Sequence, residues 1–363
     1  MTTRLIIVGG FLGAGKTTLL LRAAQMLAAQ GYRVGLVTND QGENLVDTAL
    51  AAQEDIPVAE VAGGCFCCRF PDLIKALRRL QKTVNPDVIL AEPVGSCTDL
   101  AATTLRPLRS YYPELFELAP LTILLDPGRD IAAFPAPVDY LYHQQLAEAE
   151  RLVLNKADLL APAERQAWLA ELKARYPWAQ PLALSAQTGE GVADWLAASL
   201  REVSRDLPAL ELDYQKYAEA EACLGWLNAR GILQTFLPFS AREWLTNLLD
   251  ALAQSLAERQ APIAHLKAQA TTPTAALKAS LTQSGGPISW DDFRILQDFG
   301  SLAMTERLSF ILNARVNLDP AALEALALQT FEKIKPQPGT RYHFSHFECF
   351  SPAPPQPTYR REG

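Results

Sequence analysis

The stretch RLIIVGGFLGAGKTT, residues 4–18, limits the possible folds more than any other part of the chain. A short apolar run comes first, followed by a loop with the pattern Gly, four residues, Gly-Lys-Thr, and then by a helix-like run. Such a loop closes its backbone N–H groups around phosphate oxygens when it joins a strand to the N-terminus of a helix, whose dipole favours the anion. This stretch is therefore predicted to form a strand and a phosphate-binding loop that opens a helix.

The strand and helix rhythm continues over residues 4–202, where the apolar runs YRVGLVT, DVILAE, LTILLD and RLVLNK alternate with longer helix-like stretches. This alternation predicts a doubly wound α/β fold with a mainly parallel sheet. The chain then becomes polar, and the strand-like and helix-like runs that follow are typical of a smaller α+β domain. The predicted division is a phosphate-loop domain over 1–205, a linker over 206–222, an α+β domain over 223–335, and a proline-rich tail over 336–363 that is extended or adds one strand.

The chain has 363 residues, a net charge of -7 and 6 cysteines. This length supports two domains whose cores need no disulfides. The acidic balance argues against nucleic acid as the main partner, and no stretch has the length and apolarity of a membrane span, so no membrane partner is expected. Because the first residues lack the pattern of a signal peptide, we expect a cytoplasmic protein whose thiols stay reduced.

The phosphate loop supplies the residues expected to bind a triphosphate and its Mg²⁺. Lys16 should reach the β- and γ-phosphates, and Thr17 should ligate Mg²⁺. Glu92, at the end of the predicted strand DVILAE, should hold the same ion directly or through water, unless it is an ordinary strand-end carboxylate. An amide from Gly95 should meet the γ-phosphate. The phosphate-binding set is therefore Gly10, Gly13, Ala14, Gly15, Lys16, Thr17, Thr18 and Gly95, with Lys16, Thr17 and Glu92 as catalytic residues.

The base is expected to lie at NKAD, residues 155–158, which follows the predicted strand RLVL. A carboxylate from Asp158 can accept both N–H groups of the guanine edge, which adenine does not offer, so GTP is favoured over ATP. Asn155 and Lys156 belong to the same turn. Ser185 and Ala186, in LSAQTG, are expected to meet the base through their backbone N–H groups.

Three cysteines crowd into the loop VAGGCFCCRF: Cys65, Cys67 and Cys68. Thiolates are soft ligands that suit Zn²⁺ and also bind Co²⁺, Ni²⁺ and Cu⁺. Because Cys67 and Cys68 are adjacent, their side chains diverge on regular backbone, so the sequence supports two or three ligands. Two other interpretations stay open: buried thiols that only fill the core, and a redox pair of Cys65 and Cys68, which have C-x-x-C spacing.

Two further groups of residues have metal-binding chemistry in a less specific setting. Cys97 follows Gly95, and a small buried residue is favoured there over an added metal ligand. In the tail, YHFSHFEC alternates as a strand, which would place His346 and Glu348 on one face and His343 and Cys349 on the other. We favour an edge strand with incidental polar residues over a weak second metal site or a partner contact.

Taken together, these motifs resemble the CobW-type GTPases and metallochaperones, which are kin of the GTPases that mature nickel hydrogenase and urease. The resemblance covers residues 4 to about 200 and is carried by GFLGAGKTT, VTNDQGENLVD, EVAGGCFCC, ILAEPVG, LNKADLL and LSAQTGEG. The second half is similar to the family's smaller C-terminal domain only in its pattern of strands and helices.

The resemblance implies a slow GTPase that binds Zn²⁺ or Co²⁺ at its cysteine loop and delivers it to a client metalloenzyme or to a protein of the corrinoid or cobalamin pathway. Asp40 or Glu43 of the first switch would follow the nucleotide, and Asp40 joins the catalytic set on this basis. The first switch reads TNDQG where many relatives have ENEFG, and the histidine-rich stretch of many relatives is missing, which disfavours bulk metal storage. A regulatory or redox-sensing GTPase with a structural zinc or a thiol pair is the alternative, and a homodimer is left open.

Overall fold

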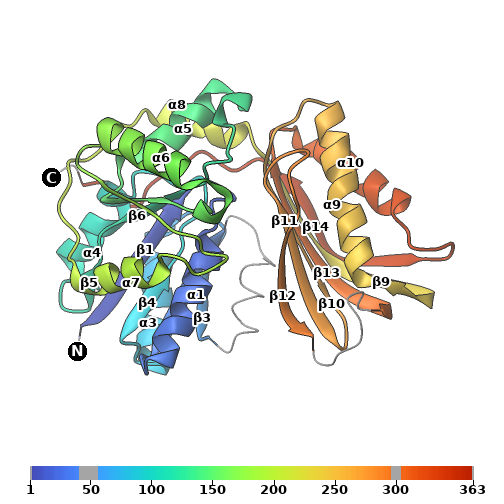
Figure 1. Cartoon of the computed structure of the whole chain (residues 1–363), viewed down its shortest axis with the longest axis horizontal. Helices are drawn as coiled ribbons and strands as arrows, with labels where there is room; N and C mark the ends of the chain where they lie inside the picture. Colours follow the sequence, from blue (N-terminus) through green and yellow to red (C-terminus); the bar gives the residue numbers. More distant parts are fainter. Residues whose placement is uncertain (1, 41–55, 296–303, 362–363) are drawn as a thin grey trace.

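The computed structural model describes residues 2–40, 56–295 and 304–361, with the side chains of Asp40 and of 291–295 left out of the description. Two sheets lie side by side, and each carries its own helices (Figure 1). The first sheet belongs to the domain that begins with the phosphate loop. The second belongs to a domain made of the last third of the chain. None of the described helices combines the length and apolar character needed to cross a membrane.

The first sheet has the strand order β3-β2-β4-β1-β6-β7-β8, with β5 paired to β1, and each of its strand pairs is parallel. This confirms the predicted doubly wound fold, and each of the apolar runs named above contains a strand. The strands are β1 Thr3–Gly10, β2 Val34–Asp40, β3 Val58–Ala62, β4 Val88–Ala91, β5 Phe116–Leu118, β6 Thr122–Leu125, β7 Arg151–Leu154 and β8 Gln180–Ala183.

Helices cover both faces of this sheet. One face packs against α1 and α7, and the other packs against α3, α4, α5 and α6. Their bounds are α1 Lys16–Ala29, α3 Phe70–Thr83, α4 Arg106–Tyr111, α5 Ala136–Ala147, α6 Pro162–Arg175 and α7 Val192–Arg201, with short turns of other helix types at Ala101–Leu105, Ile131–Ala133 and Ala157–Leu159. Because the strands are parallel, their carboxyl ends meet at one edge, where the loops that carry the predicted site residues emerge.

The second sheet has the order β12-β11-β10-β13-β9-β14, and its described strand pairs are antiparallel. Helices α9 and α10 cover one face, which is lined by alternating apolar residues such as Leu266 and Leu277. The other face carries polar residues and turns toward the first domain. The elements are β9 Gly225–Ser240, α9 Ala241–Glu258, β10 Ile263–Thr271, β11 Ala275–Leu281, β12 Ser289–Ile295, β13 Met304–Val316, α10 Pro320–Lys333 and β14 Arg341–Phe350.

The stretch expected to be an irregular linker, 206–222, contains a helix. Helix α8, Tyr214–Ala222, begins after Asp213, whose side chain accepts hydrogen bonds from the N–H groups of the first helical turn. Its buried residues Tyr217 and Ala220 pack into the core of the first domain. Because most of the surface of this helix is polar, its single apolar stripe is not apparent from the sequence.

The tail adds strand β14 to the edge of the second sheet, beside β9. A β-bulge between Phe344 and His346 inserts one residue, which reverses the alternation of faces. Cys349 therefore packs on the core face together with Phe344, while His343 takes the opposite face. The expectation that His343 and Cys349 share a face is wrong, and a metal site built from those two residues is excluded.

Candidate functional site

The phosphate loop lies between β1 and α1, as the sequence predicts. Gly10, Gly13 and Gly15 all have positive φ values, of 126°, 80° and 91°. A Cβ on Gly10 would lie 2.3 Å from the carbonyl oxygen of Leu124, so that position accepts only glycine. The loop is thus held in a conformation that L side chains rarely adopt.

Lys16 begins helix α1 and folds back over the loop. Its Nζ donates to the carbonyl oxygens of Gly10, at 2.9 Å, and Phe11, at 3.3 Å, and lies 3.9 Å from the carboxylate of Glu92. Thr17 Oγ1 donates to the Glu92 carboxylate, with a shorter distance of 2.8 Å. The hydroxyl and the strand-end carboxylate therefore form an oxygen pair of the kind that holds Mg²⁺ beside a triphosphate, and both line the same cavity.

The base-side loop is tied to the phosphate loop through Asn155. Its Nδ2 donates to the Ala14 carbonyl at 2.7 Å, and its Oδ1 accepts from the Ala186 N–H at 2.9 Å. The N–H of Ser185 donates to the carbonyl of Glu190. In this structure the Asn155 amide thus holds two loops together, and the N–H groups of Ser185 and Ala186 bond within the chain.

The carboxylate of Asp126, which the sequence motifs did not indicate, lies opposite this loop. Asp126 follows strand β6, is buried, and pairs with Lys156, whose Nζ lies 2.5 Å from Oδ2. Lys156 has a positive φ of 57°, which turns its side chain toward this partner. Asp158, the residue expected to read guanine, is exposed and lines the cavity. The signal for Asp126 was its place at the end of the run LTILLD.

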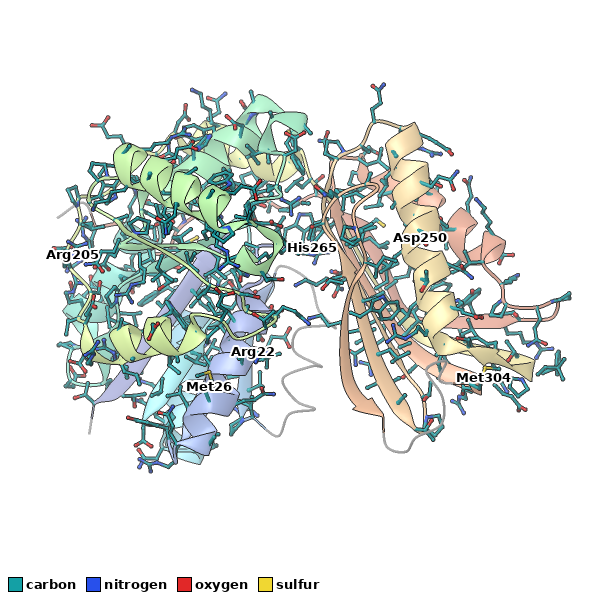
Figure 2. All side chains as sticks on the ribbon, in the orientation of Figure 1. Arg22, Met26, Arg205, Asp250, His265 and Met304 are labelled. Atoms are coloured by element: carbon teal, nitrogen blue, oxygen red, sulfur yellow. The ribbon has the colours of Figure 1, made fainter. Side chains whose placement is uncertain are left out.

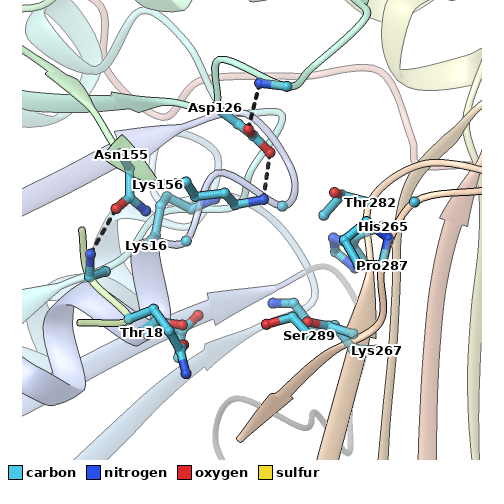
Figure 3. Close-up of a pocket in the computed structure, with 18 of the residues that line it drawn as sticks. Lys16, Thr18, Asp126, Asn155, Lys156, His265, Lys267, Thr282, Pro287 and Ser289 are labelled. Carbon is cyan, nitrogen blue, oxygen red and sulfur yellow. Dashed lines mark hydrogen bonds and ion pairs between the residues drawn. The ribbon is translucent and has the colours of Figure 1, made fainter. Parts of the chain in front are cut away.

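The cavity between the phosphate loop and the base-side loop measures about 330 Å³ and is lined by both domains. The second sheet contributes residues from the face that carries no helices (Figures 2 and 3). His265 and Lys267 come from β10 and Lys278 comes from β11, so these side chains face the lysine of the phosphate loop across the cavity. The described lining has four lysines, Lys16, Lys156, Lys267 and Lys278, against three carboxylates, Glu92, Asp126 and Asp158, and this small positive excess suits a polyphosphate.

His265 is fully buried at this boundary. Burial, with the neighbouring charges of Lys267, Arg315, Lys16 and Arg129, holds its pKa well below the usual value. Within the described part of the chain its Nδ1 has no hydrogen-bond partner. The imidazole is therefore neutral at physiological pH and leaves one nitrogen unsatisfied near the phosphate loop.

Arg129 joins the two domains. Its guanidinium donates to the carbonyl oxygens of Leu12, in the phosphate loop, and of Ile263, Ala264 and Thr282, in the second domain, at 2.8 to 2.9 Å. The group is buried, which lowers its pKa, while the nearby Asp126 acts in the opposite direction. One side chain thus ties the backbone of the phosphate loop to strand β10.

The cysteine loop follows strand β3 through two glycines with positive φ and ends where helix α3 begins. The N–H groups of Cys68 and Arg69 both donate to the Cys65 carbonyl, which coils the loop into a tight turn. The sulfur atoms of Cys65, Cys67 and Cys68 all lie within 4.8 Å of one another. Because the backbone of this turn is irregular, the adjacent side chains of Cys67 and Cys68 do not diverge, and all three thiols can face one ion.

A fourth sulfur lies beside this cluster. Cys97 Sγ is 3.9 Å from Cys67 Sγ, and both residues are buried. Hydrogen bonds from Cys65 and Cys67 lower the pKa of Cys97 to about 6, whereas the pKa of Cys67 is raised well above its usual value, mainly by its hydrogen bond with Cys65. The pKa of Cys68 is raised to about 11, first by its hydrogen bond with Cys65. A cation entering the cluster would therefore displace shared protons.

Asn39 connects the cysteine loop with the loop that follows β4. Its Nδ2 donates to the carbonyl oxygens of Val61 and Gly64, both at 2.7 Å, and its Oδ1 accepts from the N–H of Val94 at 3.3 Å. The side chain is buried. The thiol cluster and the Glu92 loop therefore share one hydrogen-bonded side chain.

Residues 351–361, which we call the C-terminal strap, return from the second domain to the first and lie over the cysteine loop (Figure 1). The N–H of Gln356 donates to Cys68 Sγ at 3.1 Å, and the N–H of Thr358 donates to the Cys67 carbonyl at 2.9 Å. Arg360 pairs with the buried Asp99 at 2.8 Å. Nothing in the tail's composition pointed to this contact.

One expected site residue takes another position, and two lie wholly or partly outside the described residues. Gly95 packs against the phosphate loop, where a Cβ would lie 2.7 Å from Leu12, and it does not line the cavity. Asp40 ends strand β2, but its side chain is outside the described residues, and Glu43 lies in the stretch that the structure does not describe. Their expected roles in the first switch stay predictions.

Comparison with known proteins gives three findings. A model described as the CobW/HypB/UreG nucleotide-binding domain matches residues 4–181. The chain is 32% identical over 169 residues to the zinc chaperone YeiR of Escherichia coli. This aligned stretch covers 46% of this chain and 50% of that protein. It is 30% identical over 218 residues to the zinc chaperone CobW of a Sinorhizobium species, covering 52% of this chain and 60% of that protein.

The chain thus spans only about half the length of the curated relatives it matches. Among solved structures, the Zn(II)-bound YjiA GTPase of Escherichia coli aligns over 91% of this chain and 99% of its own, with 15% identity and a TM-score of 0.35.

Proposed function

Because residues 4–181 match the model of the CobW/HypB/UreG nucleotide-binding domain, we propose that this chain binds and hydrolyses GTP and uses the nucleotide to hold and release a divalent transition metal. Zn²⁺ is the first candidate, since curated relatives are named zinc chaperones, and Co²⁺ is the second. The receiver would be a client metalloenzyme or a protein of the corrinoid or cobalamin pathway. The function would be carried out in the cytoplasm, and a homodimer is compatible with it.

The roles of the nucleotide-site residues follow from their chemistry. Lys16 and the N–H groups of the phosphate loop would bind the phosphates, with Gly13, Gly15 and Thr18 lining the same cavity. Thr17 and Glu92 would hold Mg²⁺, which neutralises charge on the transferred phosphoryl group. Asp158 would accept the N–H groups of guanine. Asn155 would keep the two loops in register rather than contact the base, because both ends of its amide bond the chain.

The observation that carries the metal function is the connection through Asn39. This buried side chain hydrogen-bonds the backbone beside the thiol cluster and the backbone of the loop that begins at Glu92. A shift of that loop on GTP binding would therefore be transmitted to the cysteine turn. To change from mostly holding to mostly releasing its ion, the protein needs a difference of about 10⁴-fold in affinity between the two nucleotide states.

The test is the affinity of the reduced protein for Zn²⁺ and Co²⁺, measured by competition with a chelating dye. One sample contains Mg²⁺ and a non-hydrolysable GTP analogue, and the other contains Mg²⁺ and GDP. We expect an affinity difference of orders of magnitude that Cys65→Ala abolishes and Cys223→Ala, at a half-buried cysteine elsewhere, preserves. Equal affinities in the two states would contradict metal delivery.

A redox-sensing GTPase is a second candidate, favoured by one distance. The sulfur atoms of Cys65 and Cys68 are only 3.4 Å apart and have C-x-x-C spacing. This function predicts a reversible disulfide between them that blocks metal binding, which thiol titration before and after mild oxidation would detect. A regulatory GTPase with a structural zinc would instead bind its metal equally in both nucleotide states.

A further inference from the structure

Cys97 lies outside the cysteine motif, 30 positions along the chain from Cys67, yet its sulfur is 3.9 Å from that of Cys67. It belongs to the loop that follows strand β4 and starts with Glu92. Its side chain is buried, and so are those of Cys65 and Cys67. Two separate segments of the fold therefore bring four sulfur atoms to one place.

Three of the separations between these sulfurs are close to those of a tetrahedral metal site, while Cys97 stands outside the group of three whose sulfurs all lie within 4.8 Å of one another. Zn²⁺ binds thiolates at about 2.3 Å, which puts the sulfurs of a tetrahedron about 3.8 Å apart. The structure has 3.4 Å between Cys65 and Cys68, 3.6 Å between Cys67 and Cys68, and 3.9 Å between Cys67 and Cys97. Three of the edges thus need shifts of only a few tenths of an ångström to accept the ion.

We propose that Cys97 is the fourth ligand of a four-thiolate metal site, formed with Cys65, Cys67 and Cys68. This inference rests on the proposed metal-binding function and specifies its site. The ion bound there is a soft or borderline divalent cation such as Zn²⁺ or Co²⁺, which thiolates select over Mg²⁺.

A second observation supports this site. Tyr217, from helix α8, is fully buried, and its hydroxyl has no hydrogen-bond partner among the residues that the structure describes. Burial and then the charges of Cys97, Cys65 and Cys67 raise its pKa, which places the phenol in the electrostatic field of the cluster. Thiolates that bind a metal carry negative charge and accept hydrogen bonds, so a filled cluster would attract the unpartnered O–H dipole.

The position of Cys97 gives the site a direct connection to the nucleotide. Gln145 donates to the carbonyl oxygens of both Gly95 and Cys97, at 2.9 Å each, so the two residues move together. The same loop starts at Glu92, which bonds Thr17 in the phosphate loop. A shift of Glu92 on binding of Mg²⁺ and nucleotide would therefore be transmitted through this loop to Cys97. This connection is additional to the one through Asn39.

The experiment counts sulfur ligands by X-ray absorption at the zinc edge, on reduced full-length protein loaded with one equivalent of Zn²⁺. We expect four sulfurs in the wild type, three sulfurs and one oxygen in Cys97→Ser, and four in the matched control Cys223→Ser. Three sulfurs in both the wild type and Cys97→Ser would overturn the inference and leave the proposed function in place. Protein that takes up no Zn²⁺ at all would overturn both.

The wild-type count decides the question even if Cys97→Ser does not fold, because it needs no variant. A second measurement tests the connection to the nucleotide. The difference in Zn²⁺ affinity between the GTP-analogue and GDP states should be smaller in Cys97→Ser than in Cys223→Ser. An equal difference in these two variants would make Cys97 a ligand without a role in nucleotide coupling.

Discussion

Replacing Arg129 by methionine tests whether the second domain is part of the nucleotide site. Methionine keeps much of the apolar volume and removes a guanidinium that donates to four carbonyl oxygens, one in the phosphate loop and three in the second domain. Hydrogen bonds of this kind contribute about 1 kcal/mol each, and more when a charged donor is buried. The change should therefore lower the free energy of unfolding by about 4 kcal/mol. The lower value per bond applies because the two domains can separate and let water reach the carbonyl oxygens.

The assay is differential scanning calorimetry with and without a GTP analogue. A loss of about 4 kcal/mol lowers Tm by roughly 10 °C for a domain of this size. We expect the Arg129→Met protein to unfold in two separate transitions and to bind the analogue more weakly, because Leu12 loses its anchor in the phosphate loop. Arg129→Lys should be intermediate, since lysine keeps the charge but lacks the planar fork.

The matched control is Arg109→Met. Arg109 also donates to a backbone carbonyl, that of Ser204, but its side chain is 34% exposed. Water can replace its bonds, so we expect a change below about 1 kcal/mol. If Arg129→Met and Arg109→Met unfold alike, in one transition within about 2 °C of the wild type, the guanidinium does not couple the domains.

Asp158, Lys267, Glu148 and the C-terminal strap each give a further measurable expectation. Asp158→Ala should lower GTP affinity by tenfold or more, corresponding to about 1.4 kcal/mol, and leave ATP affinity unchanged in calorimetric titrations; parallel losses would argue against a guanine contact. Lys267→Gln should weaken GTP binding more than GDP binding, relative to the exposed control Lys75→Gln, because Lys267 lines the cavity; equal losses would exclude a terminal-phosphate contact. Burial raises the pKa of Glu148 to about 8, so the folded state holds this proton more tightly than the unfolded chain does. The stabilisation from this proton is complete below about pH 4.5 and is lost as the pH rises toward 8, by as much as about 5 kcal/mol. Glu148→Gln should therefore flatten the dependence of Tm on pH. An unchanged slope would contradict the raised pKa. Deleting the strap should speed the release of Zn²⁺ to a chelator, because it uncovers the cysteine loop, and an unchanged stopped-flow rate would show that the strap does not limit exchange.

The local motifs were readable because each depends on a few adjacent residues. The glycines of the phosphate loop need positive φ values, and Lys16 and Thr17 follow them at a fixed spacing. The same holds for the three cysteines of one loop, whose thiols are potential metal ligands by residue type alone. In β14 the predicted edge strand and the shared face of His346 and Glu348 are confirmed, but alternation alone failed for His343 and Cys349, because one inserted residue at the bulge exchanges the two faces.

The sequence by itself therefore determined the parallel α/β domain, the position of the phosphate loop and the chemistry of the cysteine loop, since these follow from short-range backbone geometry and residue type. Only the tertiary structure brought Cys97 beside Cys67, put Arg129 between two domains and laid the strap across the cysteine loop. Those contacts join segments from 30 to 288 positions apart. They depend on how whole strands and helices pack, which local patterns of residues do not encode.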